Sequence, residues 1–392
     1  MMMTGNSMEL YVHIPFCVRK CAYCDFCSFP ADEETRAAYG AALLAEIRLA
    51  AEEERKKGKG DRRITSVFFG GGTPSVLDAF YIEEILASIR REFVLEEDAE
   101  ITLEANPGTL TEEKLAVYRR AGVNRLSIGL QSADDRELKL LGRIHSFADF
   151  ERNYRTARQA GFDNISVDLM AALPGQTEQG LLKSLEAAAE LSPEHLSVYS
   201  LMIEEGTPFY ERYHGKEDLL LPSEEEERAM YGACRQFLEE RGWKRYEISN
   251  YAKEGRACRH NIGYWTGVPY LGFGISASSY IDGWRFINTS DLKTYLRAMG
   301  EGGDGLLALR CPEEEVTRER AMEEFMFLGL RMTEGVSEDE FRRRFGVTME
   351  QIYGGVLERM QRQGLMEQAG ERRRLTEEGI NVSNHVMAEF LF

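Results

Sequence analysis

Short apolar runs alternate with longer amphipathic stretches along the first half of the chain. The apolar runs are six in number and cover residues 10–13, 67–69, 101–103, 125–128, 165–168 and 196–199. Between them, apolar residues recur at helical spacing over residues 33–57, 78–93, 111–121, 147–160 and 178–191. Strands that alternate with helices predict a parallel sheet covered by helices. We therefore expect an α/β fold.

The alternation of short apolar runs and amphipathic stretches ends at about residue 205. A Glu-rich helix is predicted over 223–241, and the Tyr- and Trp-rich, Gly-punctuated residues 242–288 indicate a lid or an extension of the sheet. Short helices follow at 313–331, 337–345 and 349–363, then a short segment at 373–375 and a last helix running to residue 392. This end of the chain is typical of a small, mostly helical, winged-helix-like unit. Glycines between 300 and 305 and Pro312 mark its start.

Composition and charge narrow the function classes. The 392 residues are 43% hydrophobic and 29% charged, as in ordinary globular proteins, and no run approaches 18 apolar residues. We expect no membrane span and, because the start lacks a secretory pattern, a cytoplasmic protein. The net charge of -18 argues against broad binding to nucleic acid or anionic lipid.

Cysteine spacing gives the strongest chemical signal. Four of the seven cysteines crowd into residues 17–27, which indicates a metal site in a reducing compartment. Cys17, Cys21 and Cys24 form a Cys-x3-Cys-x2-Cys loop whose thiolates could hold three irons of a cubane cluster and leave the fourth open. A structural zinc ion is the alternative, with Cys27 or His13 as the fourth ligand.

Polar motifs recur where the predicted strands end. Residues 70–74 (GGGTP) follow the second strand, 104–107 (EANP) the third and 127–132 (SIGLQS) the end of the fourth, and Asp168 closes the fifth. In β/α barrels the active site is built from the carboxyl ends of the strands. These side chains are therefore predicted to share one rim.

These motifs together resemble the coproporphyrinogen dehydrogenase-like branch of the radical S-adenosylmethionine (SAM) superfamily, with DLMAALPGQT at 168–177 as a further match. The resemblance implies a partial (β/α)6 barrel and a 4Fe-4S cluster on Cys17, Cys21 and Cys24, whose open iron SAM chelates. By matching position, the residues implied to contact SAM are Tyr11, Tyr23, Gly71, Gly72, Thr73, Glu104, Gln131, Arg143 and Asp168. Glu104 could accept from ribose hydroxyls or the amino group, and Arg143 could pair with a carboxylate.

Two features separate subfamilies within this branch. True coproporphyrinogen dehydrogenases carry a further cysteine where this chain has Phe26, and Cys27 stands one place later. Residues 260–265 match the HNxxYW hallmark of the heme chaperone family HemW at every fixed position, whereas Ser278 stands where that family usually has histidine. The resemblance covers nearly the whole chain. It implies four segments: an N-terminal extension (1–9), the radical SAM partial barrel (10–205), a barrel extension or lid carrying HNxxYW (206–311) and a HemN C-terminal-like helical domain (312–392).

The resemblance also favours heme as a ligand. His260 could ligate heme iron, and Tyr264 and Trp265 could cover a porphyrin face. Residues 241–260 hold six Lys or Arg against two Glu, a local +4 that suits propionates. Cys258 is a weaker candidate for the axial ligand. The remaining imidazoles considered are His145, His195, His214 and His385.

The leading hypothesis is a heme chaperone that delivers heme to membrane-associated respiratory proteins and forms, as the family allows, a cluster-dependent homodimer. The alternative is an oxygen-independent coproporphyrinogen III dehydrogenase, which decarboxylates propionates to give protoporphyrinogen IX. A third possibility is a radical enzyme that methylates or opens heme. No catalytic residue is assigned.

Overall fold

The structure is a computed structural model that describes residues 6–215, 221–300, 305–311 and 314–392. Its main feature is a curved sheet of twelve strands in the order β12-β11-β10-β9-β1-β2-β3-β4-β5-β6-β8-β7. Residues 1–5 of the expected N-terminal extension and residue 312, the expected start of the last domain, lie outside the described residues. The strand β1 already begins at Ser7.

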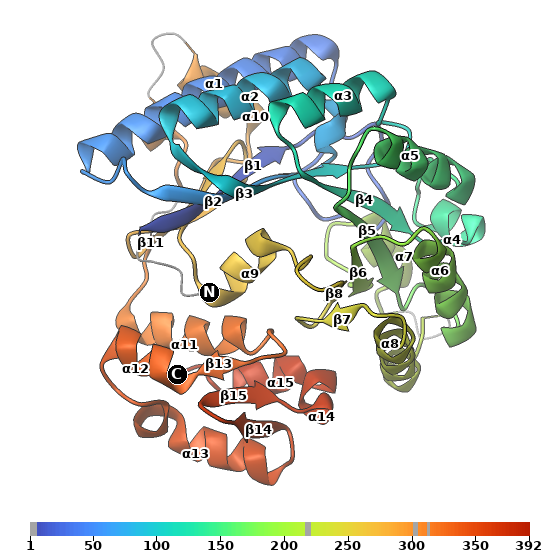
Figure 1. Ribbon diagram of the computed structural model, residues 1–392, viewed down its shortest axis with the longest axis vertical. Coiled ribbons are helices and arrows are strands. Elements are labelled where there is room, and N and C mark those ends of the chain that lie inside the picture. Colours follow the sequence, from blue (N-terminus) through green and yellow to red (C-terminus); the bar gives the residue numbers. More distant parts are fainter. Residues whose placement is uncertain (1–5, 216–220, 301–304, 312–313) are drawn as a thin grey trace.

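Six consecutive parallel strands form the centre of this sheet and confirm the predicted α/β fold. They are β1 (Ser7–Ile14), β2 (Arg63–Gly71), β3 (Val94–Ala105), β4 (Arg125–Gln131), β5 (Ile165–Ala171) and β6 (His195–Ser200). The helices that connect them are α1 (Glu33–Lys56), α2 (Ala79–Glu92), α3 (Glu112–Ala121), α4 (Asp135–Leu140), α5 (Phe147–Gln159) and α6 (Glu178–Glu190). Figure 1 shows α1, α2, α3 and α5 along the outer face of the curved sheet.

The strands alternate in polarity, and this alternation separates the two faces of the sheet. Leu10 and Val12 of β1 belong to one large core with residues of α1 and α2. Their neighbours Glu9, Tyr11 and His13 point to the opposite face, which curves around the barrel interior. Polar residues continue around that inner face on the other strands, for example Ser66, Thr102, Ser127, Asp168 and His195. The interior of this partial barrel is therefore polar, unlike the apolar filling typical of closed β/α barrels.

Residues 206–311, together with residues 314–315 just beyond them, extend the sheet at both edges. β9 (Tyr270–Phe273) lies parallel to β1, and the antiparallel β10 (Ser278–Ile281), β11 (Trp284–Ile287) and β12 (Glu314–Glu315) continue from it. At the other edge β8 (Asn250–Ala252) and β7 (Lys244–Arg245) follow β6. The helices of this region are α7 (Pro208–Tyr213), α8 (Glu224–Glu239), α9 (Arg259–Thr266) and α10 (Leu292–Met299). Of these, α9 lies on the concave side of the sheet, between it and the C-terminal unit (Figure 1).

The C-terminal unit has a core of its own, in which Met326, Phe341, Tyr353 and Phe390 are buried. Its helices are α11 (Arg318–Gly329), α12 (Glu338–Phe345), α13 (Met349–Arg362), α14 (Glu377–Asn381) and α15 (Ser383–Ala388). Its small sheet has the order β13 (Val336–Ser337), β15 (Arg372–Leu375), β14 (Met366–Ala369). The single last helix expected from the sequence is two short helices, because Val382 leaves helical geometry between them (φ -123°, ψ 32°).

No helix within the described residues is long and apolar enough to cross a membrane. The longest helix of the described residues, α1, has 24 residues, and its buried residues recur at helical spacing along the face that packs on the sheet.

Candidate functional site

The three cysteines of the Cys-x3-Cys-x2-Cys motif lie in the loop that follows β1, at the carboxyl-end rim of the barrel. This loop packs closely against the glycine-rich turn after β2. Gly71 has a positive φ of 112°, and a Cβ atom there would lie 2.5 Å from the ring of His13. A Cβ atom on Gly72 would lie 2.8 Å from the carbonyl oxygen of Phe16, the residue before Cys17. Glycine therefore fits at 71 without displacing His13, and at 72 without displacing the start of the cysteine loop.

Each cysteine sulfur has a potential hydrogen-bond donor beside it. Thr73 Oγ1 donates to Cys17 Sγ over 3.6 Å, and Arg143 Nη1 donates to Cys21 Sγ over 3.7 Å. Cys24 Sγ lies 4.0 Å from the hydroxyl of Ser28. Burial raises the pKa of the Cys24 thiol. Donors aimed at sulfur suit anionic, metal-bound thiolates, so this donor set fits an iron-sulfur cluster.

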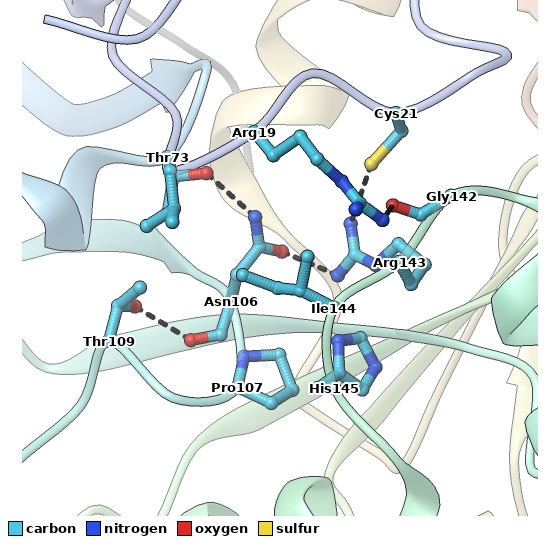
Figure 2. Close-up of a pocket in the computed structure, with 11 residues that line it drawn as sticks. Arg19, Cys21, Thr73, Asn106, Pro107, Thr109, Gly142, Arg143, Ile144 and His145 are labelled. Atoms are coloured by element: carbon cyan, nitrogen blue, oxygen red, sulfur yellow. Dashed lines mark hydrogen bonds between the residues drawn. The ribbon is translucent and has the colours of Figure 1, made fainter.

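Asn106 joins two of these donors, and the sequence analysis missed it as a site residue. Its side-chain amide donates to Thr73 Oγ1 over 2.7 Å, and its oxygen accepts from Arg143 Nη2 over 2.7 Å. Figure 2 shows this bridge between Thr73 and Arg143 at the rim. The same Arg143 nitrogen donates to the carbonyl of Gly129 at 2.7 Å. The EANP motif contained Asn106, but no local pattern showed that it spans these two donors.

A small pocket, partly open to solvent, lies at this network. It is lined by Cys21, Thr73, Asn106, Arg143 and neighbouring residues of the rim. The structure thus brings together side chains from the cysteine loop, the β2 turn, the end of β3 and the segment after α4.

A pair of partly buried carboxyl groups lies deeper in the barrel. Glu104 Oε2 accepts from the backbone N–H of Gly71 over 3.2 Å. Burial, together with the nearby charge of Asp168, raises the pKa of Glu104 to about 8. Burial also raises the pKa of Asp168, against the hydroxyls of Ser197 and Ser127 and the charge of Arg125. Because Glu104 accepts only from Gly71 among the described residues, the pair favours a ligand that brings hydroxyl or ammonium groups, as SAM does.

The remaining residues implied to contact SAM lie on β1, in the cysteine loop and at the end of β4. Tyr11 lies on the inner face of β1, and its hydroxyl is 3.1 Å from His13 Nδ1. Tyr23 packs edge-on against Phe209 of α7, with ring centroids 6.4 Å apart, and faces Arg143. Gln131 ends β4 with a positive φ of 69°, a conformation that non-glycine residues rarely adopt and that often marks functional sites.

Cys27 is separated from the other three cysteines of the loop. Its side chain packs against the large core of the sheet and its helices, and its backbone carbonyl oxygen lies 2.9 Å from His13 Nε2. No three His, Cys, Asp or Glu side chains within the described ranges are grouped so as to hold a single metal ion. The ligands of a cubane cluster, in contrast, each bind a separate iron.

His260 lies at the opposite end of the barrel interior from the cysteines, on α9. It is 1% exposed. Its Nδ1 is 2.8 Å from Ser66 Oγ, its Nε2 is 3.0 Å from Tyr264 OH, and its ring stacks on Phe68 with centroids 5.0 Å apart. Burial lowers the pKa of His260 to about 3. Both ring nitrogens are therefore engaged in packing α9 against the barrel, and iron ligation would require one of these bonds to open.

The basic residues around the HNxxYW segment are engaged as well. Arg245 pairs with Glu377 at 2.7 Å, Arg259 with Asp98 at 3.1 Å and Arg256 with Asp163 at 3.9 Å. Three of the six basic side chains that give residues 241–260 their local charge of +4 are thus paired with acidic side chains from other segments. Trp265 lies under the guanidinium of Arg331, 4.3 Å from it.

The histidines differ in solvent exposure. His13, His145, His195 and His260 are buried and hydrogen-bonded, whereas His214 and His385 are exposed. His214 follows α7, whose first residues contact the cysteine loop through a hydrogen bond from Phe209 N to Ala22 O of 3.0 Å.

Comparison with known proteins gives two family matches. The model of the radical SAM superfamily matches residues 11–188, and that of the HemN C-terminal domain matches residues 316–382.

Similar proteins span nearly the whole chain. Heme chaperone HemW of Bacillus subtilis is 39% identical over 97% of this chain and 98% of its own length. Heme chaperone HemW of Haemophilus influenzae is 34% identical over 98% of both. Among solved structures, coproporphyrinogen III oxidase (HemN) of Escherichia coli superposes with a TM-score of 0.82 at 23% identity, covering 98% of this chain and 90% of that one. This last likeness concerns the fold.

Proposed function

Since the chain belongs to the HemW family of the radical SAM superfamily, we propose that it is a heme chaperone that holds a 4Fe-4S cluster and SAM and delivers heme to acceptor proteins. The family implies the cluster and SAM. The heme, its delivery to membrane-associated respiratory proteins, the cytoplasmic location and a cluster-dependent homodimer belong to the proposal. The names of the relatives support the heme part.

The observation that carries the cofactor part is the convergence of three thiols at the rim with two partly buried carboxyls just inside it. Cys17, Cys21 and Cys24 would hold the cluster. Glu104 and Asp168 would receive hydroxyl or ammonium groups of SAM, and Arg143 would stay beside Cys21 and within reach of a ligand carboxylate. When bound, the cluster supplies an electron that can cleave SAM.

Cysteine variants test the cluster assignment. Cys17→Ala, Cys21→Ala or Cys24→Ala should abolish the broad thiolate-to-iron absorption and SAM binding after anaerobic reconstitution, because three ligands leave no redundancy. Cys27→Ala is the matched control within the same loop and should retain four irons. Loss of the cluster in Cys27→Ala would reassign the ligands.

The axial ligand of heme needs a separate test. Sequence reasoning proposed His260, which could ligate iron only after its bond to Ser66 or Tyr264 opened. The exposed His214 and His385 require no such opening. Hemin titration of His260→Ala, His214→Ala and His385→Ala should show a shifted Soret band in the variant that lacks the ligand. A shift in His260→Ala alone would support the sequence-based assignment and would mean that α9 moves. Arg256→Glu and Arg259→Glu should weaken uptake, more so at low salt, if propionates bind at the same segment.

Two parallel incubations distinguish a heme chaperone from an enzyme. Reconstituted, reduced protein is mixed anaerobically with SAM and coproporphyrinogen III, and in parallel with hemin. We expect stable heme uptake, transfer of heme to heme-depleted respiratory membranes, and no porphyrin product. Formation of protoporphyrinogen IX would overturn the chaperone proposal in favour of the dehydrogenase, and a modified heme would favour a heme-methylating or ring-opening enzyme.

A further inference from the structure

A chain of hydrogen bonds leads from Asp168 across the barrel interior to the segment before α9. Ser166 Oγ lies 3.4 Å from Asp168 Oδ1 and 2.7 Å from His195 Nδ1. His195 Nε2 is 2.9 Å from the hydroxyl of Tyr246, which accepts from the backbone N–H of Cys258 over 3.3 Å. His195 is 1% exposed and Ser166 2%. The chain therefore connects β5, β6 and the segment between β7 and α9 away from solvent.

The requirement that every donor in this chain find an acceptor gives the chain a direction. A backbone N–H can only donate, and an ionised carboxylate can only accept. With Cys258 N–H donating to Tyr246, the Tyr246 hydroxyl hydrogen is available to His195 Nε2. His195 Nδ1–H then donates to Ser166, and the Ser166 hydroxyl hydrogen is left to donate to Asp168. All five groups are satisfied in this one arrangement.

A neutral imidazole is needed, because only the neutral ring has one donor and one acceptor. Burial and the positive charge of Arg125 both lower the pKa of His195. Arg125 is itself 1% exposed and lies near the buried Glu100, 3.7 Å away. The surroundings of His195 thus supply the required protonation state.

We propose that His195 is a positioning residue for SAM binding, which directs the hydroxyl of Ser166 toward Asp168, and that Tyr246 selects the tautomer that allows it. In the other tautomer Nδ1 would accept from Ser166, and Asp168 would lose that donor. The inference rests on the proposed role of Asp168 in holding SAM. It makes the 246–258 segment part of the SAM site although it lies outside the rim motifs.

A double-mutant cycle tests this role, with SAM affinity measured by calorimetry on reconstituted protein. Tyr246→Phe and Ser166→Ala should each weaken SAM binding about threefold to tenfold, the loss expected for one neutral hydrogen bond. Because both act through the same donor, the double variant should be no weaker than the single ones. A merely structural role would give independent, additive losses, and additivity would overturn the proposal.

Tyr251→Phe is the matched control. Tyr251 lies on β8, and its hydroxyl faces Cys234 of α8, away from the barrel interior. It should bind SAM as the parent does, and affinity in Tyr246→Phe equal to that of Tyr251→Phe would also overturn the proposal. A parent protein that binds no SAM would instead refute the proposed function.

His195 itself provides a second test should Tyr246→Phe fold poorly. The amide of His195→Asn can donate near the position of Nδ1, whereas His195→Ala cannot. We expect His195→Asn to bind SAM within about threefold of the parent and His195→Ala to bind about tenfold more weakly. Equal affinities in these two variants would contradict the positioning role.

Discussion

At the scale of single residues, the polar side chains near the carboxyl ends of the strands have different roles because their surroundings differ. Thr73, Asn106 and Arg143 bond to one another and to two cysteine sulfurs, so they support the cysteine loop. Among the described residues, Glu104 accepts its hydrogen bond from Gly71 alone and has a second carboxyl as its neighbour. It is the residue whose protonation and ligand binding should be most closely linked.

Stability should report the protonation of Glu104. A pKa of about 8 in the folded state, against 4.5 ordinarily, means that the native protein binds more protons than the unfolded chain between these values. The free energy of unfolding therefore falls as pH rises through this window. Glu104→Gln removes this pH dependence. Between pH 5 and pH 8.5, the free energy of unfolding of the variant should therefore rise by about 1–4 kcal/mol relative to that of the parent. Urea unfolding of cluster-free protein measures it, with the exposed Glu225→Gln on α8 as control. Parallel pH curves for parent and Glu104→Gln would refute the assignment.

The affinity for SAM should depend directly on the carboxyl groups of Glu104 and Asp168. Glu104→Ala or Asp168→Ala should weaken binding by about 1–3 kcal/mol, as expected for a lost charge-assisted hydrogen bond, with iron content unchanged. Calorimetry measures the affinity, and the exposed Asp163→Ala, just before β5, is the control. Unchanged affinity in both variants would contradict a SAM site at these carboxyls.

At the scale of elements, α9 closes the end of the barrel interior opposite the cysteines. The helix approaches β1 so closely that a Cβ atom on Gly263 would lie 2.1 Å from Glu9 Oε1. At the start of α9, Glu100 Oε1 accepts from Cys258 Sγ over 3.4 Å and from the backbone N–H groups of Arg259 and His260 over 2.8 and 3.3 Å. The HNxxYW segment thus joins the interior of the barrel to the C-terminal unit.

The close approach of α9 predicts the effect of a single methyl group. Gly263→Ala should destabilise the protein by about 1–3 kcal/mol, because Glu9 and α9 must separate. Gly232→Ala on α8 has open space around it and should be neutral or stabilising by up to about 1 kcal/mol. Thermal unfolding of the two cluster-free variants compares them, and equal melting temperatures would contradict the packing.

At the scale of the whole molecule, ion pairs of buried and partly exposed side chains hold the C-terminal unit to the barrel. Glu247, fully buried, lies 3.6 Å from Arg331, whose guanidinium covers Trp265 of α9. The backbone N–H of Ile248 donates to the carbonyl of Arg331 over 3.1 Å. Arg245 and Arg285 make further ion pairs with Glu377 and Glu324 across the same interface.

Removal of one of these charges should loosen the interface. Arg331→Met leaves Glu247 buried without its cation, which should cost about 1–3 kcal/mol and increase hydrogen exchange at residues 246–250 and 329–333. Arg359→Met, which breaks a pair with Glu389 inside the C-terminal unit, is the control. Unchanged exchange at both segments would show that the interface does not depend on this pair.

The local pattern of the sequence determined the six parallel strands, their helices and the position of the cysteine and glycine motifs at one rim. These features follow from spacing along the chain, since period and caps are properties of neighbouring residues. Short apolar runs identified the strands but concealed the polar inner face, because inward and outward residues alternate within the same run.

Only the tertiary structure decided what the polar side chains do. Asn106 became a bridge because β2, β3 and the segment after α4 meet at the rim, and His260 became a buried packing residue because β1, β2 and β3 bring Glu9, Ser66 and Glu100 to α9. The link from Asp168 to Tyr246 likewise spans about eighty residues of sequence through His195. A histidine's chemistry depends on which atoms face its two nitrogens, and those atoms come from parts of the chain that only folding brings together.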